Sequence, residues 1–145
     1  MGSGKQKDTD AIVQKLNEIL EFEISGVTRY LHYSFMMFGA SRIPITGWLR
    51  GHATDGMNHA TQCGEWITAL GGHPTVKVRP TPEGHKHDVK TMLTEALTFE
   101  REGMAKYVEL FELARDQNIA LEDWARKIMG EEQAHIYEMD KMLRT

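Results

Sequence analysis

The stretch Glu131-Glu132-Gln133-Ala134-His135, near the end of the sequence, decides the fold class of this chain. In a helix, residues three positions apart lie one above the other, so Glu132 and His135 share one face. The same face carries the apolar stripe of this segment, which consists of Leu121, Ile128, Met139 and Met142. A carboxylate and an imidazole are costly in a helix core unless a partner compensates them. The pattern therefore predicts a helix whose core-facing side chains bind a metal ion.

Apolar residues at helical spacing predict four helices in all. The predicted helices cover approximately residues 8–38, 44–70, 88–115 and 120–145. Each helix places at least one metal-capable side chain on its apolar stripe, namely Glu23, His59, Glu100, and Glu132 with His135. One carboxylate could reach the rim of a core, and one histidine could be hydrogen-bonded inside it. Coincidence in all four helices favours a shared metal site, because di-iron bundles combine Glu-x-x-His motifs with single glutamates.

Residues 73–87 form a long connection between the second and third helices and contain three of the four prolines. Proline interrupts helices, and a connection of this length allows the helices that it joins to run parallel. His73, His85 and His87 lie here, either as solvated side chains or as part of a surface metal site. The short link near residues 116–118 makes the third and fourth helices antiparallel neighbours. The expected fold is an all-α, antiparallel four-helix bundle with a long crossover between helices two and three.

The composition limits the possible partners. The chain has 145 residues and a net charge of −4, which fits one domain and argues against binding to nucleic acid. No apolar stretch approaches the roughly 18 residues of a membrane span, so we expect no membrane partner. The single cysteine, Cys63, gives no internal disulfide and fits a reducing, cytoplasmic location. We expect residues 1–7 to be disordered or tag-derived and residues 8–145 to form the bundle domain.

The spacing around the candidate ligands assigns further roles. Carboxylate and imidazole ligands together suit iron or manganese, and also zinc. Glu132 is placed to bridge two cations. Tyr30 follows Glu23 by seven residues and would lie one or two turns from the centre, where it could hydrogen-bond a ligand or supply an electron. Asp55 precedes His59 by four residues, so both side chains can face one point.

Several stretches between about residues 10 and 143 resemble the bacterioferritins, a group within the ferritin-like superfamily. These stretches are Leu16–Glu23 followed by Tyr30, Gly56–Ala60, Leu97–Glu100 with Gly103, and Glu131–Ile136. The resemblance implies a ferroxidase with a di-iron centre, which oxidises Fe(II) with dioxygen or peroxide and stores ferric mineral inside a protein shell. The implied iron ligands are Glu23, His59, Glu100, Glu132 and His135, with Tyr30 beside them. It also implies a homo-oligomer, either a twofold dimer or a cage.

At two neighbouring positions, the sequence matches the bacterioferritin pattern once and differs from it once. Met57 occupies the place of the methionine that binds haem b from two subunits in bacterioferritins, although packing at a dimer interface would equally explain it. Gly56 stands where the family has a bridging glutamate, and Asp55 is a candidate substitute metal ligand. The sequence therefore allows a second function, a haem-binding or structural ferritin-like dimer with a degraded metal site. A DNA-protecting shell and a rubrerythrin-type oxidoreductase are disfavoured, because the ligands lie within the bundle and the chain has one cysteine.

Overall fold

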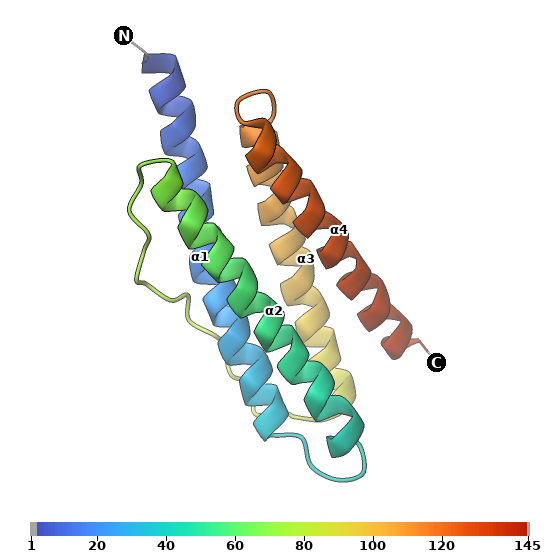
Figure 1. The fold of residues 1–145 in the computed structure, drawn as a ribbon. Helices are drawn as coiled ribbons and strands as arrows, with labels where there is room; N and C mark the ends of the chain where they lie inside the picture. The colour runs from blue at the N-terminus through green and yellow to red at the C-terminus, as the bar shows by residue number, and fades with distance from the viewer. Residues whose placement is uncertain (1–2, 145) are drawn as a thin grey trace.

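Four α-helices make up the computed structural model, which describes residues 3–144 (Figure 1). The helices are α1 (Ser3–Phe35), α2 (Arg42–Ala69), α3 (Val89–Ala114) and α4 (Ile119–Leu143). No β-strand occurs within residues 3–144. The prediction of an all-α fold is confirmed.

The helices form two antiparallel hairpins, α1 with α2 and α3 with α4 (Figure 1). The connection between α2 and α3 returns along the length of the bundle, so these two helices run parallel. It lies against α1, because Asn17 accepts a hydrogen bond from the backbone N–H of Thr75 and Thr81 donates one to the carbonyl oxygen of Ser25. The predicted four-helix bundle with a long crossover between helices two and three is therefore present.

Local sequence explains where the helices begin and end. Asp88 caps α3 by accepting a hydrogen bond from the N–H of Thr91, and Asn118 caps α4 in the same way. Gly39 and Gly71 follow α1 and α2 with φ angles of +83° and +81°, a conformation that glycine adopts without steric cost.

The structure differs from the sequence prediction at both ends of α1. Residues 3–7, which we expected to be disordered or tag-derived, continue the helix, because no proline lies between them and the amphipathic segment. Gln6 hydrogen-bonds Asp10 across one turn at 2.8 Å. Residues 1–2 lie outside the described residues. At the other end the helix stops at Phe35 rather than Phe38, and Phe38 lies 73 % exposed in the following turn.

Buried apolar residues form two clusters, one toward each end of the bundle. One cluster draws on residues 12–19 of α1, 63–67 of α2, 107–114 of α3 and 121–128 of α4. The other draws on residues 22–33 of α1, Met37 just after that helix, and residues 49–53, 92–99 and 136–139 of the other three helices. The middle of the bundle is therefore flanked by apolar packing. Within residues 3–144, no helix is long and apolar enough to cross a membrane.

Candidate metal centre

Four charged or titratable side chains lie buried near the middle of the bundle, one from each helix. Glu23, His59, Glu100 and Glu132 are each only 4–5 % exposed. They line one pocket together with residues that the sequence also predicted for the site, namely Tyr30, Asp55 and His135. The helical spacing of each stripe brings these groups inward, as apolar residues at the same positions would be. The structure thus gathers seven of the eight predicted site residues, although their chemical roles stay predictions.

Glu23 and His59 form the more tightly hydrogen-bonded half of the centre. Nδ1 of His59 lies 2.8 Å from Oε2 of Glu23, and the hydroxyl of Tyr107 donates to the same oxygen at 2.9 Å. Burial raises the pKa of Glu23, while the bond from His59 opposes that rise. Nε2 of His59 lies 3.0 Å from Oε2 of Glu131. Burial lowers the pKa of His59, but Glu23 and Glu131 outweigh it and raise that pKa to about 9.

Glu100, Glu132 and His135 form the other half. The hydroxyl of Tyr30 donates a hydrogen bond to Oε1 of Glu100. Oε1 of Glu132 lies 3.9 Å from Nδ1 of His59 and 4.0 Å from Nδ1 of His135, so Glu132 stands between the two histidines. Burial, followed by a hydrogen bond with Glu100 and then by the negative charge of Glu100, raises the pKa of Glu132. Nδ1 of His135 is buried and has no hydrogen-bond partner among the residues that the structure describes.

The contacts between the two hairpins are reciprocal. Tyr30 of α1 donates to Glu100 of α3, and Tyr107 of α3 donates to Glu23 of α1. The carboxylates that precede the two histidines by four residues behave in the same way. Glu131 lies 3.0 Å from Nε2 of His59, and Asp55 lies 3.6 Å from Nε2 of His135. Each hairpin therefore supplies the outer partner for the other hairpin's histidine.

Gly56 interrupts this reciprocity. A Cβ atom at this position would lie 3.3 Å from Cγ2 of Val27 and 3.4 Å from the carbonyl oxygen of Glu23, so α2 approaches the α1 backbone closely here. Asp55 does not take over the position of a side chain at residue 56. Its carboxylate lies beside Nε2 of His135, whereas Nδ1 is the nitrogen of that ring that faces Glu132.

His52 adds a further imidazole to the pocket that Gly56 lines. Its ring centroid lies 4.5 Å from that of His135 and 5.0 Å from that of Tyr30. Its Nδ1 lies 3.8 Å from Oε1 of Glu100. Burial lowers the pKa of His52, and the neighbouring His135 lowers it further, which favours the neutral form that binds metals.

The donor atoms at this centre fit a divalent cation. Ligand atoms of Glu100, Glu132 and His135 lie within 4.8 Å of one another, and so do those of His52, Asp55 and His135. Three buried carboxylates need compensating positive charge, and the buried Nδ1 of His135, which has no hydrogen-bond partner among residues 3–144, needs a donor or a cation facing its lone pair. A cation would satisfy both needs, and carboxylate with imidazole is a ligand set of iron, manganese or zinc.

Sequence reasoning assigned no role in the site to Glu131, Tyr107 or His52. Tyr107 follows Glu100 by seven residues, which repeats the spacing of Glu23 and Tyr30, so that repeat could have revealed it. Glu131 adjoins Glu132, but its contact with His59 joins residues far apart in the sequence. Met57 is the predicted site residue that does not line the pocket, and its side chain is 49 % exposed on α2.

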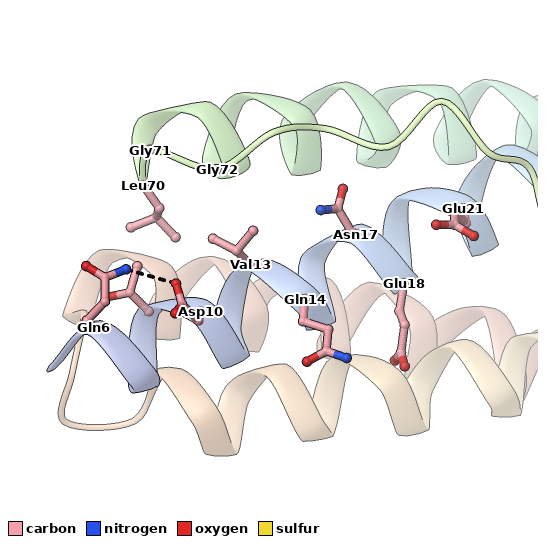
Figure 2. A pocket seen from close by; sticks show the side chains of 11 residues that line it. Gln6, Asp10, Val13, Gln14, Asn17, Glu18, Glu21, Leu70, Gly71 and Gly72 are labelled. Carbon is pink, nitrogen blue, oxygen red and sulfur yellow. Dashed lines mark hydrogen bonds between the residues drawn. The ribbon is translucent and has the colours of Figure 1, made fainter. Parts of the chain in front are cut away.

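A larger pocket, of about 430 Å³, lies along the N-terminal half of α1, next to the residues that follow α2 (Figure 2). Gln6, Asp10, Asn17 and Gly72 are among the residues that line it. It includes no member of the three-residue ligand groups found among the described residues. The candidate chemistry is therefore in the middle of the bundle rather than in this wider pocket.

Residues 13–145 of the chain match the family described as the ferritin-like domain. The chain belongs to the ferritin-like family. The match identifies the family as a whole and does not single out the bacterioferritins within it.

A solved structure agrees with this assignment. The ferritin-like chain superposes, with a TM-score of 0.89 and 28 % sequence identity, on a crystal structure described as ferritin like, diiron-carboxylate proteins from Bacillus anthracis str. Ames. The alignment covers 94 % of this chain and 98 % of that chain. A comparison with curated proteins gives no match.

Proposed function

We propose that this ferritin-like protein binds Fe(II) as its substrate at the centre of the bundle, oxidises it to Fe(III), and serves in iron storage and detoxification. The observation that carries the proposal is the position of Glu132 between His59 and His135, with Glu23 and Glu100 supplied by the other two helices. The likeness to a protein described as diiron-carboxylate supports the choice of iron.

The arrangement supports two iron positions that share Glu132. Glu23 and Nδ1 of His59 would hold one Fe(II) ion, and Glu100 with Nδ1 of His135 would hold the other. Carboxylate oxygens are hard ligands, which favour the ferric product. Two Fe(II) ions each give up one electron, and dioxygen takes up both electrons with two protons to form hydrogen peroxide. With hydrogen peroxide as the oxidant, two electrons and two protons give two molecules of water.

Glu131 and Asp55 would act on this reaction through the histidines. A metal-binding histidine usually donates its second N–H to a carboxylate or carbonyl, which fixes the tautomer and the orientation of the ring. Glu131 stands in that relation to His59, and Asp55 to His135. We therefore assign Asp55 primarily to orienting His135. Its place in a group with His52 and His135 still makes it a candidate direct ligand.

Stopped-flow oxidation of Fe(II) by the metal-free protein tests the proposal, with iron added in steps per subunit. We expect rapid oxidation that saturates at two Fe(II) ions per subunit, as a di-iron site requires. Slow oxidation that rises with iron without saturating would contradict it, because free iron in air behaves in that way.

The alternative function rests on the exposure of Met57. A half-exposed thioether on α2 is available to a second subunit, and thioethers are soft ligands suited to haem iron. If haem binds between two subunits there, the purified protein shows a Soret absorbance band that Met57→Leu abolishes. A Soret band that survives in Met57→Leu would exclude Met57 as the ligand. Sedimentation of the same two samples tests the proposed homo-oligomer and its dependence on residue 57.

A further inference from the structure

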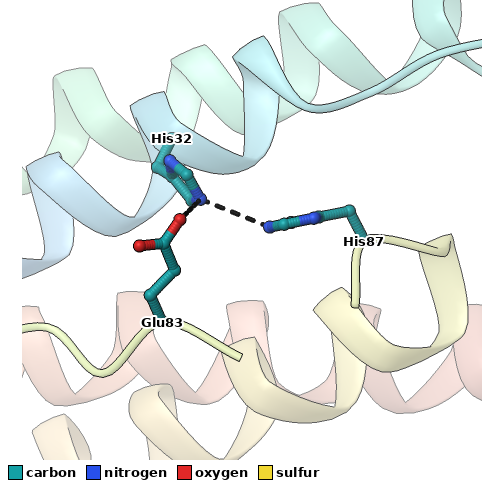
Figure 3. A group of neighbouring side chains, drawn as sticks. All are labelled: His32, Glu83 and His87. Carbon is teal, nitrogen blue, oxygen red and sulfur yellow. Dashed lines mark hydrogen bonds and ion pairs between the residues drawn. The ribbon is translucent and has the colours of Figure 1, made fainter. Parts of the chain in front are cut away.

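A second group of ligand side chains lies outside the bundle centre, where the crossover meets α1 (Figure 3). His32 projects from α1, and Glu83 and His87 come from the crossover shortly before α3. Nε2 of His32 lies 3.3 Å from Nε2 of His87 and 3.3 Å from Oε1 of Glu83. One ligand atom from each residue lies within 4.8 Å of the other two. Three side chains from two segments therefore converge on one point.

The two separations of 3.3 Å match the edges of a tetrahedral zinc site. Zinc binds imidazole nitrogen and carboxylate oxygen at about 2.0–2.2 Å, so a tetrahedron of such ligands has edges of about 3.3–3.6 Å. Two histidines and one glutamate are a known ligand set for zinc, with water in the fourth position. A pocket of about 140 Å³ adjoins the group and leaves room for that water.

Hydrogen bonding alone serves this group poorly. Nε2 of His32 faces both Glu83 and His87 at the same distance of 3.3 Å, which is long for a hydrogen bond. A single proton on that nitrogen cannot point at both atoms. A cation placed among the three atoms would attract the carboxylate and both lone pairs at once. The other charged side chains that line the pocket are Arg29, Lys86 and Glu95. Their charges are of both signs, so Glu83 does not face positive charges alone.

We propose that His32, Glu83 and His87 bind a zinc ion that fastens the crossover to α1. The site is separate from the bundle centre, and the inference does not depend on iron oxidation. The crossover is a long segment without helix or strand, and its length makes its ordering costly. A metal link between its end and α1 would hold the segment that lets α2 and α3 run parallel.

Cobalt(II) is the probe for the first experiment, because tetrahedral cobalt absorbs visible light far more strongly than six-coordinate cobalt. We expect one tetrahedral Co²⁺ per subunit, displaced by Zn²⁺, in the wild-type protein and in the control His73→Ala. His32→Ala and His87→Ala should lose the signal. Absence of the signal in the wild type, or its survival in both variants, would overturn the proposal.

His135→Ala separates this site from the bundle centre. The variant should keep the tetrahedral Co²⁺ signal, because His135 belongs to the bundle centre and not to the group of His32, Glu83 and His87. Loss of the signal in His135→Ala, with retention in His32→Ala, would assign it to the bundle centre and overturn the proposal. Glu83→Gln, a substitution on the exposed crossover, should weaken Zn²⁺ binding by tenfold or more without disturbing the fold.

Trypsin cleavage after Lys86 gives a structural readout. Lys86 is exposed and lies between Glu83 and His87 in the sequence. Zinc should slow this cleavage several-fold in the wild type, because the bound ion fixes the residues on either side. It should not slow cleavage in His32→Ala, where the cleaved sequence is unchanged. Equal protection of the two proteins would show that zinc acts elsewhere and would overturn the proposal.

Discussion

The α1–α2 hairpin and the α3–α4 hairpin carry nearly the same set of site residues, with one exception. Each first helix has a glutamate followed by a tyrosine after seven residues, Glu23 with Tyr30 and Glu100 with Tyr107. Each second helix has a histidine preceded by a carboxylate four residues earlier. The exception is the position three residues before the histidine, which is Glu132 in α4 and Gly56 in α2.

The centre forms only where the two hairpins meet. Neither tyrosine bonds to the glutamate of its own helix, and neither outer carboxylate serves the histidine of its own helix. The two halves are unequal in strength. His59 has partners at 2.8 and 3.0 Å, whereas the nearest carboxylates to His135 lie at 3.6 and 4.0 Å. The nitrogen without a hydrogen-bond partner among the described residues, Nδ1 of His135, belongs to the weaker half, and Gly56 lines the pocket that both halves share.

Removal of Glu132 or His135 should have the largest effect on Fe(II) oxidation. Glu132→Ala takes away the carboxylate that both halves share, and His135→Ala takes away the ligand of the weaker half. Loss of an outer partner of a metal site costs roughly 10–100-fold, so loss of a ligand should slow rapid Fe(II) oxidation by about 100-fold or more. Stopped-flow absorbance checks this, with His73→Ala as the control. Unchanged rates in both variants would refute the assignment of the site.

The second test compares the two outer carboxylates. Glu131→Gln should lower the rate of Fe(II) oxidation by roughly 10–100-fold, because the histidine–carboxylate pair that orients His59 is lost. Asp55→Asn should have a smaller effect, because its carboxylate stands 3.6 Å from His135 rather than 3.0 Å. Glu138→Gln, an exposed change on α4, is the control. A larger loss in Asp55→Asn would mean that Asp55 binds iron directly.

The sequence predicted what depends on helical spacing. The stripes that include Glu23, Glu100 and Glu132 place these residues inward because the period of a helix fixes which side chains share a face. The crossover followed from its prolines, and the parallel direction of α2 and α3 followed from its length. Local rules of this kind need no knowledge of neighbouring helices.

The sequence could not predict what depends on the rotation of one helix against another. Asp55 and His59 share a face of α2, so the sequence allowed both to meet one ion, yet Asp55 lies beside His135 instead. The pairing of Glu131 with His59 joins residues 72 positions apart. Phe38 fits the apolar period but lies in a turn, because the helix had already ended at Phe35. In each of these cases, contacts between elements decide an arrangement that a local pattern leaves open.

The smallest expected effect is that of Gly56→Glu, which makes residue 56 of α2 equivalent to Glu132 of α4. A glutamate here would give α2 the same Glu-x-x-His motif as α4 and add a carboxylate at the pocket that both halves share. We expect tighter binding of the second Fe(II) ion by roughly tenfold or more, since even an outer partner of a metal site contributes roughly 10–100-fold. Titration of Fe(II) oxidation against iron per subunit measures it, as a sharper break at saturation.

Gly56→Ala is the matched control, because any side chain at this position meets the same neighbours. Its Cβ would lie 3.3 Å from Val27, so α1 and α2 must separate by a few tenths of an ångström. Alanine gains about 1 kcal/mol of helix propensity over glycine, which offsets part of that strain. Gly56→Ala should therefore leave Fe(II) binding close to that of the wild type. If both variants weaken Fe(II) binding equally, Gly56 is required for the close approach of α1 and α2. The difference between the two halves would then be a consequence of packing rather than of a lost ligand.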